Sequence, residues 1–418
     1  MKKRTIIFAL VLALVLALLS GCGGKPESAA GTASPAAPAP AAGASSTPAD
    51  TPQPPTGDPV KIGMLGHLSG GEAYVCLAAK AALEDYIEEL NAQGGLLGRP
   101  LELVVYDYSI DAATEAVSAT NRFIQQDHVV AIIGPYGSTA AIPMIPLVAE
   151  AKVPVIATAA TNPKVTVDED TGELNEYMFR ICFIDPYQGE ALAGFAYKQG
   201  LRKVATLTEI GNPYSAGLLD YFTETFTALG GEVVMQEGYQ HNDVEFRAQV
   251  SNAAANGADT IFMPATNYRD AGLVSLQARD LGLEFTYLFG DGIYSQELLD
   301  VAEGALDGAF MTNAVSEDDP AFAEYRDQFA ARHPGNSANI YVYYTLDAMM
   351  LLEWAIRDCG SFDGEAIKNS LESAVNVPLF TESLTMDPAT HNPLNKSVSI
   401  IQIVDSEYVL FETFKPEE

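Results

Sequence analysis

The chain has 418 residues, with 55 Asp and Glu against 23 Lys and Arg, which gives a formal net charge of −32 at pH 7. This acidity excludes a nucleic-acid partner, because phosphate backbones would be repelled and the sequence has no Lys/Arg cluster with interleaved aromatic residues. The histidines and cysteines are scattered, without the spacing of a zinc site or a disulfide framework, so we expect no metal and no other cofactor.

The N-terminus has the pattern of an export signal over residues 1–21. Three cations precede an apolar run from Ile6 to Leu19, which is shorter than the roughly 20 residues needed to span a bilayer. The segment Leu19-Ser20-Gly21-Cys22 resembles the lipobox of bacterial lipoproteins, which implies that Cys22 carries a lipid and anchors an extracytoplasmic protein to the cell membrane. An ordinary signal peptide with a chance cysteine is the alternative.

A tether follows Cys22 and extends to residue 59. The stretch Gly23 to Pro59 holds ten Ala and nine Pro and has no aromatic or large aliphatic residue, so it cannot form a core. Residues 60–418 are rich in Val, Ile, Leu and Ala and are too numerous for one core, which predicts two lobes.

Strand and helix patterns alternate along the first part of the domain. Short apolar runs alternate with amphipathic stretches, which predicts parallel strands covered by helices on both faces. The predicted strands are Val60–Leu65, Leu101–Tyr106, Val129–Ile133 and Val153–Ala157, and the predicted helices are Ala73–Ala92, one from near Ala112 and one from near Thr139.

A second alternating series begins after Asp185. Its predicted helices are Tyr187–Lys198, Ala216–Leu229, Val244–Ala255 and Ala271–Leu281, and its predicted strands are Val204–Leu207, Glu232–Gln236, Thr260–Met263 and Thr286–Phe289. The fold class is therefore α/β, with two Rossmann-like lobes.

Ligands bind such sheets beyond the carboxyl ends of the strands, so the loops there are the candidate site. Ser138 and Thr139 follow one strand, and Thr161, Asn162 and Pro163 follow the next. Thr161 or Asn162 would be a helix N-cap with Pro163 at the first helical position, where amide N–H groups favour a carboxylate. Capping alone is the alternative for each loop.

Five short motifs occur in order along the domain: Gly66-His67-Leu68-Ser69-Gly70, Asn91-Ala92-Gln93-Gly94-Gly95-Leu96-Leu97-Gly98-Arg99, Ile132-Ile133-Gly134-Pro135, Ala159-Ala160-Thr161-Asn162-Pro163 and Asn212-Pro213-Tyr214-Ser215-Ala216-Gly217. In these motifs the domain resembles the type I periplasmic binding proteins of the leucine/isoleucine/valine-binding family, which are receptors of branched-chain amino acid ABC transporters. The resemblance extends from Val60 to about Val404 and implies a hinge and a ligand cleft between the lobes.

The resemblance also implies roles for individual residues. Ser138 and Thr161 would hold the carboxylate of an amino acid, and the Ala159 carbonyl with Asp291 would hold its ammonium. The family often has Glu at the Asp291 position, so this chain departs from it there, and a turn before Gly292 is the alternative role. The pocket walls implied by the resemblance are Tyr214, Tyr74, Tyr136 and Tyr341, with Asp185 at the first crossing between the lobes.

The sequence has no hydrolase, P-loop or dinucleotide motif, so we expect a binding protein and not an enzyme. We expect a monomer that binds an amino acid or related ligand and delivers it to an ABC permease. A ligand-sensing lipoprotein with a signalling partner is the alternative. The resemblance implies that lobe 1 comprises residues 60–184 plus 314–394 and that lobe 2 comprises residues 185–313 plus 395–418.

Overall fold

The computed structural model describes residues 54–70, 73–108, 113–317, 319–394 and 396–415. The predicted export signal, Cys22 and most of the tether lie outside the described residues. Within the part of the chain that is described, no helix is both long and apolar enough to cross a membrane.

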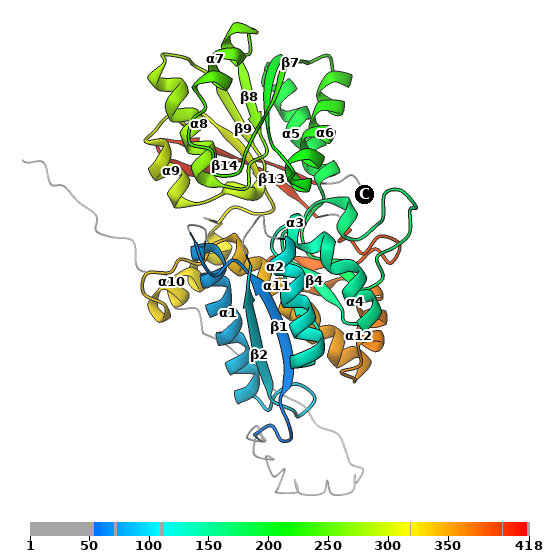
Figure 1. The fold of residues 1–418 in the computed structure, drawn as a ribbon. Helices are drawn as coiled ribbons and strands as arrows, with labels where there is room; N and C mark the ends of the chain where they lie inside the picture. Colours follow the sequence, from blue (N-terminus) through cyan, green and yellow to red (C-terminus); the bar gives the residue numbers. More distant parts are fainter. Residues whose placement is uncertain (1–53, 71–72, 109–112, 318, 395, 416–418) are drawn as a thin grey trace, which may run out of the picture. The chain divides into compact units, whose positions relative to one another are not determined.

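The first lobe is built on a five-stranded sheet in which every neighbouring pair is parallel (Figure 1). Its order is β2-β1-β3-β4-β5, with β1 at Val60–Gly66, β2 at Leu101–Asp107, β3 at Ile132–Ile133, β4 at Val155–Ala157 and β5 at Met178–Arg180. The four predicted strands are present, although β3 and β4 are shorter than predicted, and β5 was not predicted.

The second lobe is built on a seven-stranded sheet in the order β14-β13-β10-β9-β8-β6-β7. The strands are β6 (Lys203–Glu209), β7 (Glu232–Tyr239), β8 (Thr260–Met263), β9 (Thr286–Phe289), β10 (Phe310–Asn313), β13 (Val398–Val404) and β14 (Glu407–Phe414). Strands β6 to β10 pair in parallel, whereas β13 and β14 form an antiparallel hairpin beside β10. The hairpin turns at Asp405 and Ser406, which have φ of 52° and 58°.

Helices cover both sheets. The helices are α1 (Ala73–Ala92), α2 (Ala113–Arg122), α3 (Ser138–Ala141), α4 (Ile145–Ala151), α5 (Asp185–Lys198), α6 (Pro213–Ala228), α7 (Arg247–Ala255), α8 (Tyr268–Asp280), α9 (Gln296–Ala302), α10 (Ala323–Arg332), α11 (Ile340–Cys359) and α12 (Gly364–Glu372). Figure 1 shows α8 and α9 on one side of the second sheet and α5 and α6 on the other. Helix α11 packs against α1, so the chain returns to the first lobe after β10.

Each sheet has an apolar core on both faces, as predicted for buried parallel strands. In β3, Ile133 belongs to the cluster under α1 and α11, while Ile132 belongs to the cluster under α2 and α4. In β8, Ile261 and Phe262 likewise point into different clusters. The predicted α/β fold with two lobes is confirmed, and the exact lobe boundaries stay a prediction.

Candidate ligand-binding site

A cavity lies where loops from the carboxyl ends of strands in both sheets meet. We call it the polar chamber; its walls are Tyr136, Gly137, Ser138, Thr139, Ala159, Asn212, Tyr214, Thr266, Asp291 and Gly292. The first four follow β3, Ala159 follows β4, and the remaining residues follow β6, β8 and β9. This is the position at which parallel sheets bind ligands.

A glycine turn directs the loop after β3 into the polar chamber. Gly134 has φ of +91°, and a Cβ there would lie 2.4 Å from the Leu65 carbonyl oxygen, so no other residue fits. The turn places Ser138 at the start of α3, where its hydroxyl accepts a hydrogen bond from the Asn162 N–H at 3.2 Å. Because the amides of a first helical turn have no carbonyl partner within the helix, the Ser138 and Thr139 N–H groups remain for other acceptors.

The loop after β4 differs from its predicted form. Asn162 is the cap, and its side chain accepts from the Lys164 N–H, but Pro163–Val165 is a single 3-10 turn rather than an α-helix. The expected convergence of helical amides on Thr161 is therefore wrong. Thr161 is fully buried and is not a wall residue of the polar chamber, whereas Ala159 is.

Asp291 is a buried carboxylate at the wall contributed by the second lobe. Only 6% of the residue is exposed, and its Oδ1 accepts hydrogen bonds from Gln188 Nε2 and the Tyr214 hydroxyl, both at 2.9 Å. Both donors are neutral, and the ion pairs formed among the described residues do not involve Asp291. Burial raises the pKa of Asp291, and the hydrogen bonds from Gln188, Tyr214 and its own backbone N–H oppose that rise only in part.

The glycines on either side of Asp291 leave room for the side chains that donate hydrogen bonds to its carboxylate. A Cβ on Gly290 would lie 2.1 Å from the Tyr214 hydroxyl and 2.9 Å from Gln188 Oε1, and a Cβ on Gly292 would lie 2.6 Å from the Ala265 carbonyl oxygen. The Gly290-Asp291-Gly292 turn is therefore packed against the residues that hold the carboxylate.

A second carboxylate of this lobe, Glu209 at the end of β6, lies behind the wall. Its Oε2 accepts from the Thr266 hydroxyl at 2.6 Å, and its Oε1 lies 3.1 Å from Asn212 Nδ2 and 3.2 Å from His241 Nδ1. Burial by itself would raise the pKa of Glu209, but the hydrogen bonds outweigh burial and lower it. The network fixes Thr266 and Asn212, two wall residues that were not predicted although both follow strand ends.

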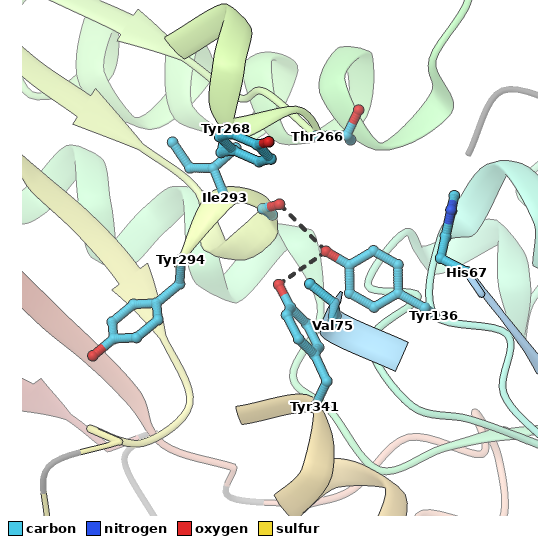
Figure 2. A pocket seen from close by; sticks show the side chains of 9 residues that line it. His67, Val75, Tyr136, Thr266, Tyr268, Ile293, Tyr294 and Tyr341 are labelled. Carbon is cyan, nitrogen blue, oxygen red and sulfur yellow. Dashed lines mark hydrogen bonds between the residues drawn. The ribbon is translucent and has the colours of Figure 1, made fainter. Parts of the chain in front are cut away.

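A smaller cavity adjoins the polar chamber and shares Tyr136, Thr266 and Gly292 with it. We call it the aromatic chamber; its other walls are His67, Val75, Tyr268, Ile293, Tyr294 and Tyr341. The Tyr136 hydroxyl lies 2.9 Å from the Tyr341 hydroxyl and 3.3 Å from the Gly292 carbonyl oxygen, and its single proton serves one of these two acceptors at a time (Figure 2). The Tyr341 hydroxyl donates in turn to the Asp291 carbonyl at 3.3 Å.

The structure thus brings five of the predicted site residues to one cavity: Tyr136, Ser138, Ala159, Tyr214 and Asp291. Tyr341 borders the adjoining chamber, and the Tyr74 side chain lies outside the described part of the chain. No group of three or more His, Cys, Asp or Glu side chains among the described residues is placed to hold a metal ion. Cys76 and Cys182 are buried, whereas Cys359 is only partly buried.

Asp185 lies at the start of α5, where the chain passes from β5 toward the second lobe. It is fully buried, and its backbone N–H donates to the Thr161 carbonyl at 3.0 Å. Burial raises the pKa of Asp185 to about 8; the Thr161 side chain opposes this rise, Asp291 adds to it, and Arg180 opposes it more weakly. The Arg180 guanidinium instead donates to the carbonyls of Ala160 and Asn162, at 2.7 and 2.9 Å.

The chain has two α/β lobes and a polar cavity lined by loops from both lobes. These are the features of a two-lobed solute-binding protein. The chain belongs to the periplasmic binding protein family, whose model matches residues 59–407. It is 28% identical over 363 residues to the Leu/Ile/Val-binding protein homolog 2 of Brucella abortus, an alignment that covers 86% of this chain and 91% of that protein. The resemblance inferred from the sequence is confirmed.

Solved structures agree with this assignment. The leucine binding protein LivK from Thermotoga maritima is 30% identical, with a TM-score of 0.76 over 85% of this chain and 99% of that one. A solute binding protein from R. palustris in complex with 4-hydroxybenzoate has a TM-score of 0.74 over 86% of this chain and 97% of that one, at 22% identity. The second likeness shows the common fold alone.

Proposed function

We propose that the protein is the extracytoplasmic substrate-binding lipoprotein of an ABC transporter, that it binds an α-amino acid in the polar chamber, and that it delivers this ligand to a permease. Its family and its relatives named as Leu/Ile/Val-binding and leucine binding proteins support the proposal. In this role the protein recognises and releases its ligand without chemical change.

The observation that carries the proposal is the environment of Asp291. A desolvated carboxylate is costly unless a cation or sufficient hydrogen bonds compensate it, and Asp291 has two neutral donors on one oxygen. The described wall residues of the polar chamber include no Lys or Arg. The ammonium of an α-amino acid supplies the missing positive charge.

The opposite wall suits the carboxylate end of the same ligand. The Ser138 hydroxyl accepts from Asn162, which leaves its proton to donate, and the Ser138 and Thr139 amides point from the start of α3. Hydrogen bonds from neutral donors to a carboxylate are stronger than those between neutral groups. The Ala159 carbonyl is an acceptor for the ammonium on this side, and Thr161 stays a candidate carboxylate partner in this proposal.

Placing the two charged ends on different lobes couples binding to closure. The ligand favours the closed form because only that form satisfies both ends. Contacts between the lobes already exist near the chamber, such as the Asn162 Nδ2 donation to the Pro213 carbonyl at 2.9 Å. Small-angle scattering at saturating ligand should give a smaller radius of gyration than the free protein, and an unchanged curve would count against hinge closure.

A thermal-shift screen tests the ligand class. Purified protein is heated with each proteinogenic amino acid, with 4-hydroxybenzoate and with simple amines, since a structural neighbour holds 4-hydroxybenzoate. The proposal expects stabilisation by one or more amino acids and none by the benzoate. Stabilisation by benzoates alone would contradict it, because those acids have no ammonium for Asp291.

Membrane fractionation tests the lipid anchor. The proposal assigns the anchor to Cys22, so Cys22→Ala should move the protein from the membrane pellet to the soluble fraction, since a polar tether does not insert into lipid. The wild-type protein, washed with the same high-salt buffer, is the control. A Cys22→Ala protein that still pellets after that wash would show that Cys22 is not the anchor.

A further inference from the structure

The aromatic chamber adjoins the polar chamber, in which the proposed function places the charged ends of the ligand. It shares three walls with the polar chamber, namely Tyr136, Thr266 and Gly292. The polar chamber encloses about 30 Å³ and the aromatic chamber about 10 Å³ of space open to water, enough for roughly two water molecules and one. Neither chamber alone holds a whole amino acid in this state.

Tyr136 and Gly292, two of the shared walls, lie in contact where the two chambers adjoin. The hydroxyl of Tyr136, which follows β3 of the first lobe, lies 3.3 Å from the carbonyl oxygen of Gly292, which follows β9 of the second lobe; a dashed line marks this contact in Figure 2. At 3.3 Å this hydrogen bond is longer than usual for an O–H donor, whereas the bond from Tyr136 to Tyr341 is 2.9 Å. The contact with Gly292 is therefore the weaker of the two.

The walls of the aromatic chamber are chiefly rings. They comprise His67, Tyr136, Tyr268, Tyr294 and Tyr341, and the aliphatic side chains among them are Val75 and Ile293. Tyr136 and Tyr341 meet edge to face, with centroids 4.6 Å apart and planes at 82°, and Tyr136 meets His67 at 89°. A ring that enters between such walls gains edge-to-face contacts that a branched aliphatic group cannot make.

We propose that the aromatic chamber receives the ligand side chain and that the preferred ligand is an α-amino acid with an aromatic side chain, rather than a branched aliphatic one. This inference rests on the proposed function, since the polar chamber must hold the α-ammonium and α-carboxylate. Aromatic contacts of this kind correspond to a preference of about 2- to 12-fold for phenylalanine or tyrosine over leucine, beyond the effect of area.

Calorimetric titration of the wild-type protein tests the preference. The ligands are alanine, valine, leucine, isoleucine, phenylalanine, tyrosine, tryptophan and 3-phenylpropanoate, which lacks the ammonium. The inference expects an aromatic amino acid to bind most tightly. Leucine, isoleucine or valine binding as tightly as the best aromatic amino acid would overturn it and leave the proposed function intact.

The same titration separates the two proposals. Binding of 3-phenylpropanoate as tight as that of phenylalanine would support the aromatic chamber and contradict the ammonium contact of the proposed function. Failure of every amino acid to bind would contradict both.

A chamber-filling variant tests the location of the side chain. Val75 is buried on α1 and borders the aromatic chamber but not the polar one, so Val75→Phe should weaken phenylalanine binding at least about tenfold and alanine binding less than about threefold. Leu77→Phe, on an exposed position of the same helix, is the matched control.

Circular dichroism establishes that the variants fold. If Val75→Phe does not fold, Val75→Leu, which adds one carbon, is titrated in its place with the same direction expected. Unchanged phenylalanine binding by a folded Val75 variant would place the side chain elsewhere and overturn the inference.

Discussion

Two buried carboxylates of the second lobe, Glu209 and Asp291, have opposite environments. Glu209 is held by three side chains, Thr266, Asn212 and His241, and its pKa is lowered below 4.5. Asp291 has two neutral donors on one oxygen, and its pKa is raised above 3.8. Asp291 is a wall residue of the polar chamber, whereas Glu209 contacts the wall residues Asn212 and Thr266 from behind.

The comparison distinguishes a carboxylate whose charge is compensated by the protein, Glu209, from one whose charge a cationic ligand would compensate, Asp291. Glu209 contributes stability above its unfolded pKa, near 4.5, and this stability is lost as the pH falls through its lower folded pKa. The ionised Asp291 instead reduces stability, and that cost appears as the pH rises above 3.8 through its raised folded pKa. A cationic ligand should remove the cost.

Loss of the Asp291 carboxylate should have the largest effect on binding. Asp291→Ala removes one partner of a desolvated ion pair, which typically costs about 2–5 kcal/mol, or roughly 30-fold to several thousandfold in Kd. Calorimetric titration measures the change, with circular dichroism as the control for folding. An Asp291→Ala protein with parental affinity would place Asp291 in the same structural class as Glu209.

Ser138, on the opposite wall, should matter less. Ser138→Ala removes one hydroxyl donor to an anionic carboxylate, worth about 1.5–3 kcal/mol, but keeps the backbone amides. The variant should therefore bind more tightly than Asp291→Ala in the same titration. The reverse ranking would contradict the assignment of the stronger charge contact to the second lobe.

Glu209→Gln should sharpen the comparison by changing stability rather than binding. The amide cannot accept from Thr266, Asn212 and His241 as a carboxylate does, so unfolding should become easier by about 1–3 kcal/mol. Affinity should change less than that of Ser138→Ala, because Glu209 is not a wall residue. Thermal unfolding measures the stability of the variant, and calorimetric titration of the same sample measures its affinity. A large loss of affinity with unchanged stability would show that Glu209 acts in binding and not in stability.

Asp185 extends the comparison to a carboxylate away from the chamber walls. Between its ordinary pKa of 3.8 and its folded value of about 8, the native state holds a proton that the unfolded state lacks. Stability should therefore fall as the pH rises through this window, by up to about 1.4 kcal/mol per pH unit. Asp185→Asn should flatten the dependence of Tm on pH, and an equally steep profile in this variant would contradict the assignment.

Much of the fold could be predicted because buried parallel strands have continuous apolar runs, even where they are short. β8 and β9 were predicted to the residue, as was helix α1. Strand β5 could not be predicted, because it has only three residues and ends in a charged residue, Arg180. The guanidinium of Arg180 is buried and donates to the carbonyls of Ala160 and Asn162, which come near it only in the folded chain. The bounds of β10, β13 and β14 were not predicted, because the alternating pattern of strands and helices was followed only as far as Phe289.

Residues of the candidate site could be predicted where a single loop after a predicted strand, or a family motif, points to them. Ser138 and Ala159 follow predicted strands directly, and Asp291 was found through the family resemblance. Thr266 was missed because its role depends on Glu209, 57 positions away, and a single loop does not reveal that contact. The cap rule correctly predicted Asn162 as one of two candidate caps and Pro163 at the first position, but it did not predict that a single 3-10 turn follows, because a cap motif does not fix the length of the helix.

The central claim is that Asp291 compensates the ammonium of the ligand. A double cycle tests it directly: the wild-type protein and Asp291→Asn, which keeps the size of the side chain, are each titrated with the best amino acid and with its analogue that lacks the amino group. The account predicts that the wild type prefers the amino acid by at least about 30-fold and that Asp291→Asn loses most of this preference. An equal preference in both proteins would contradict the claim.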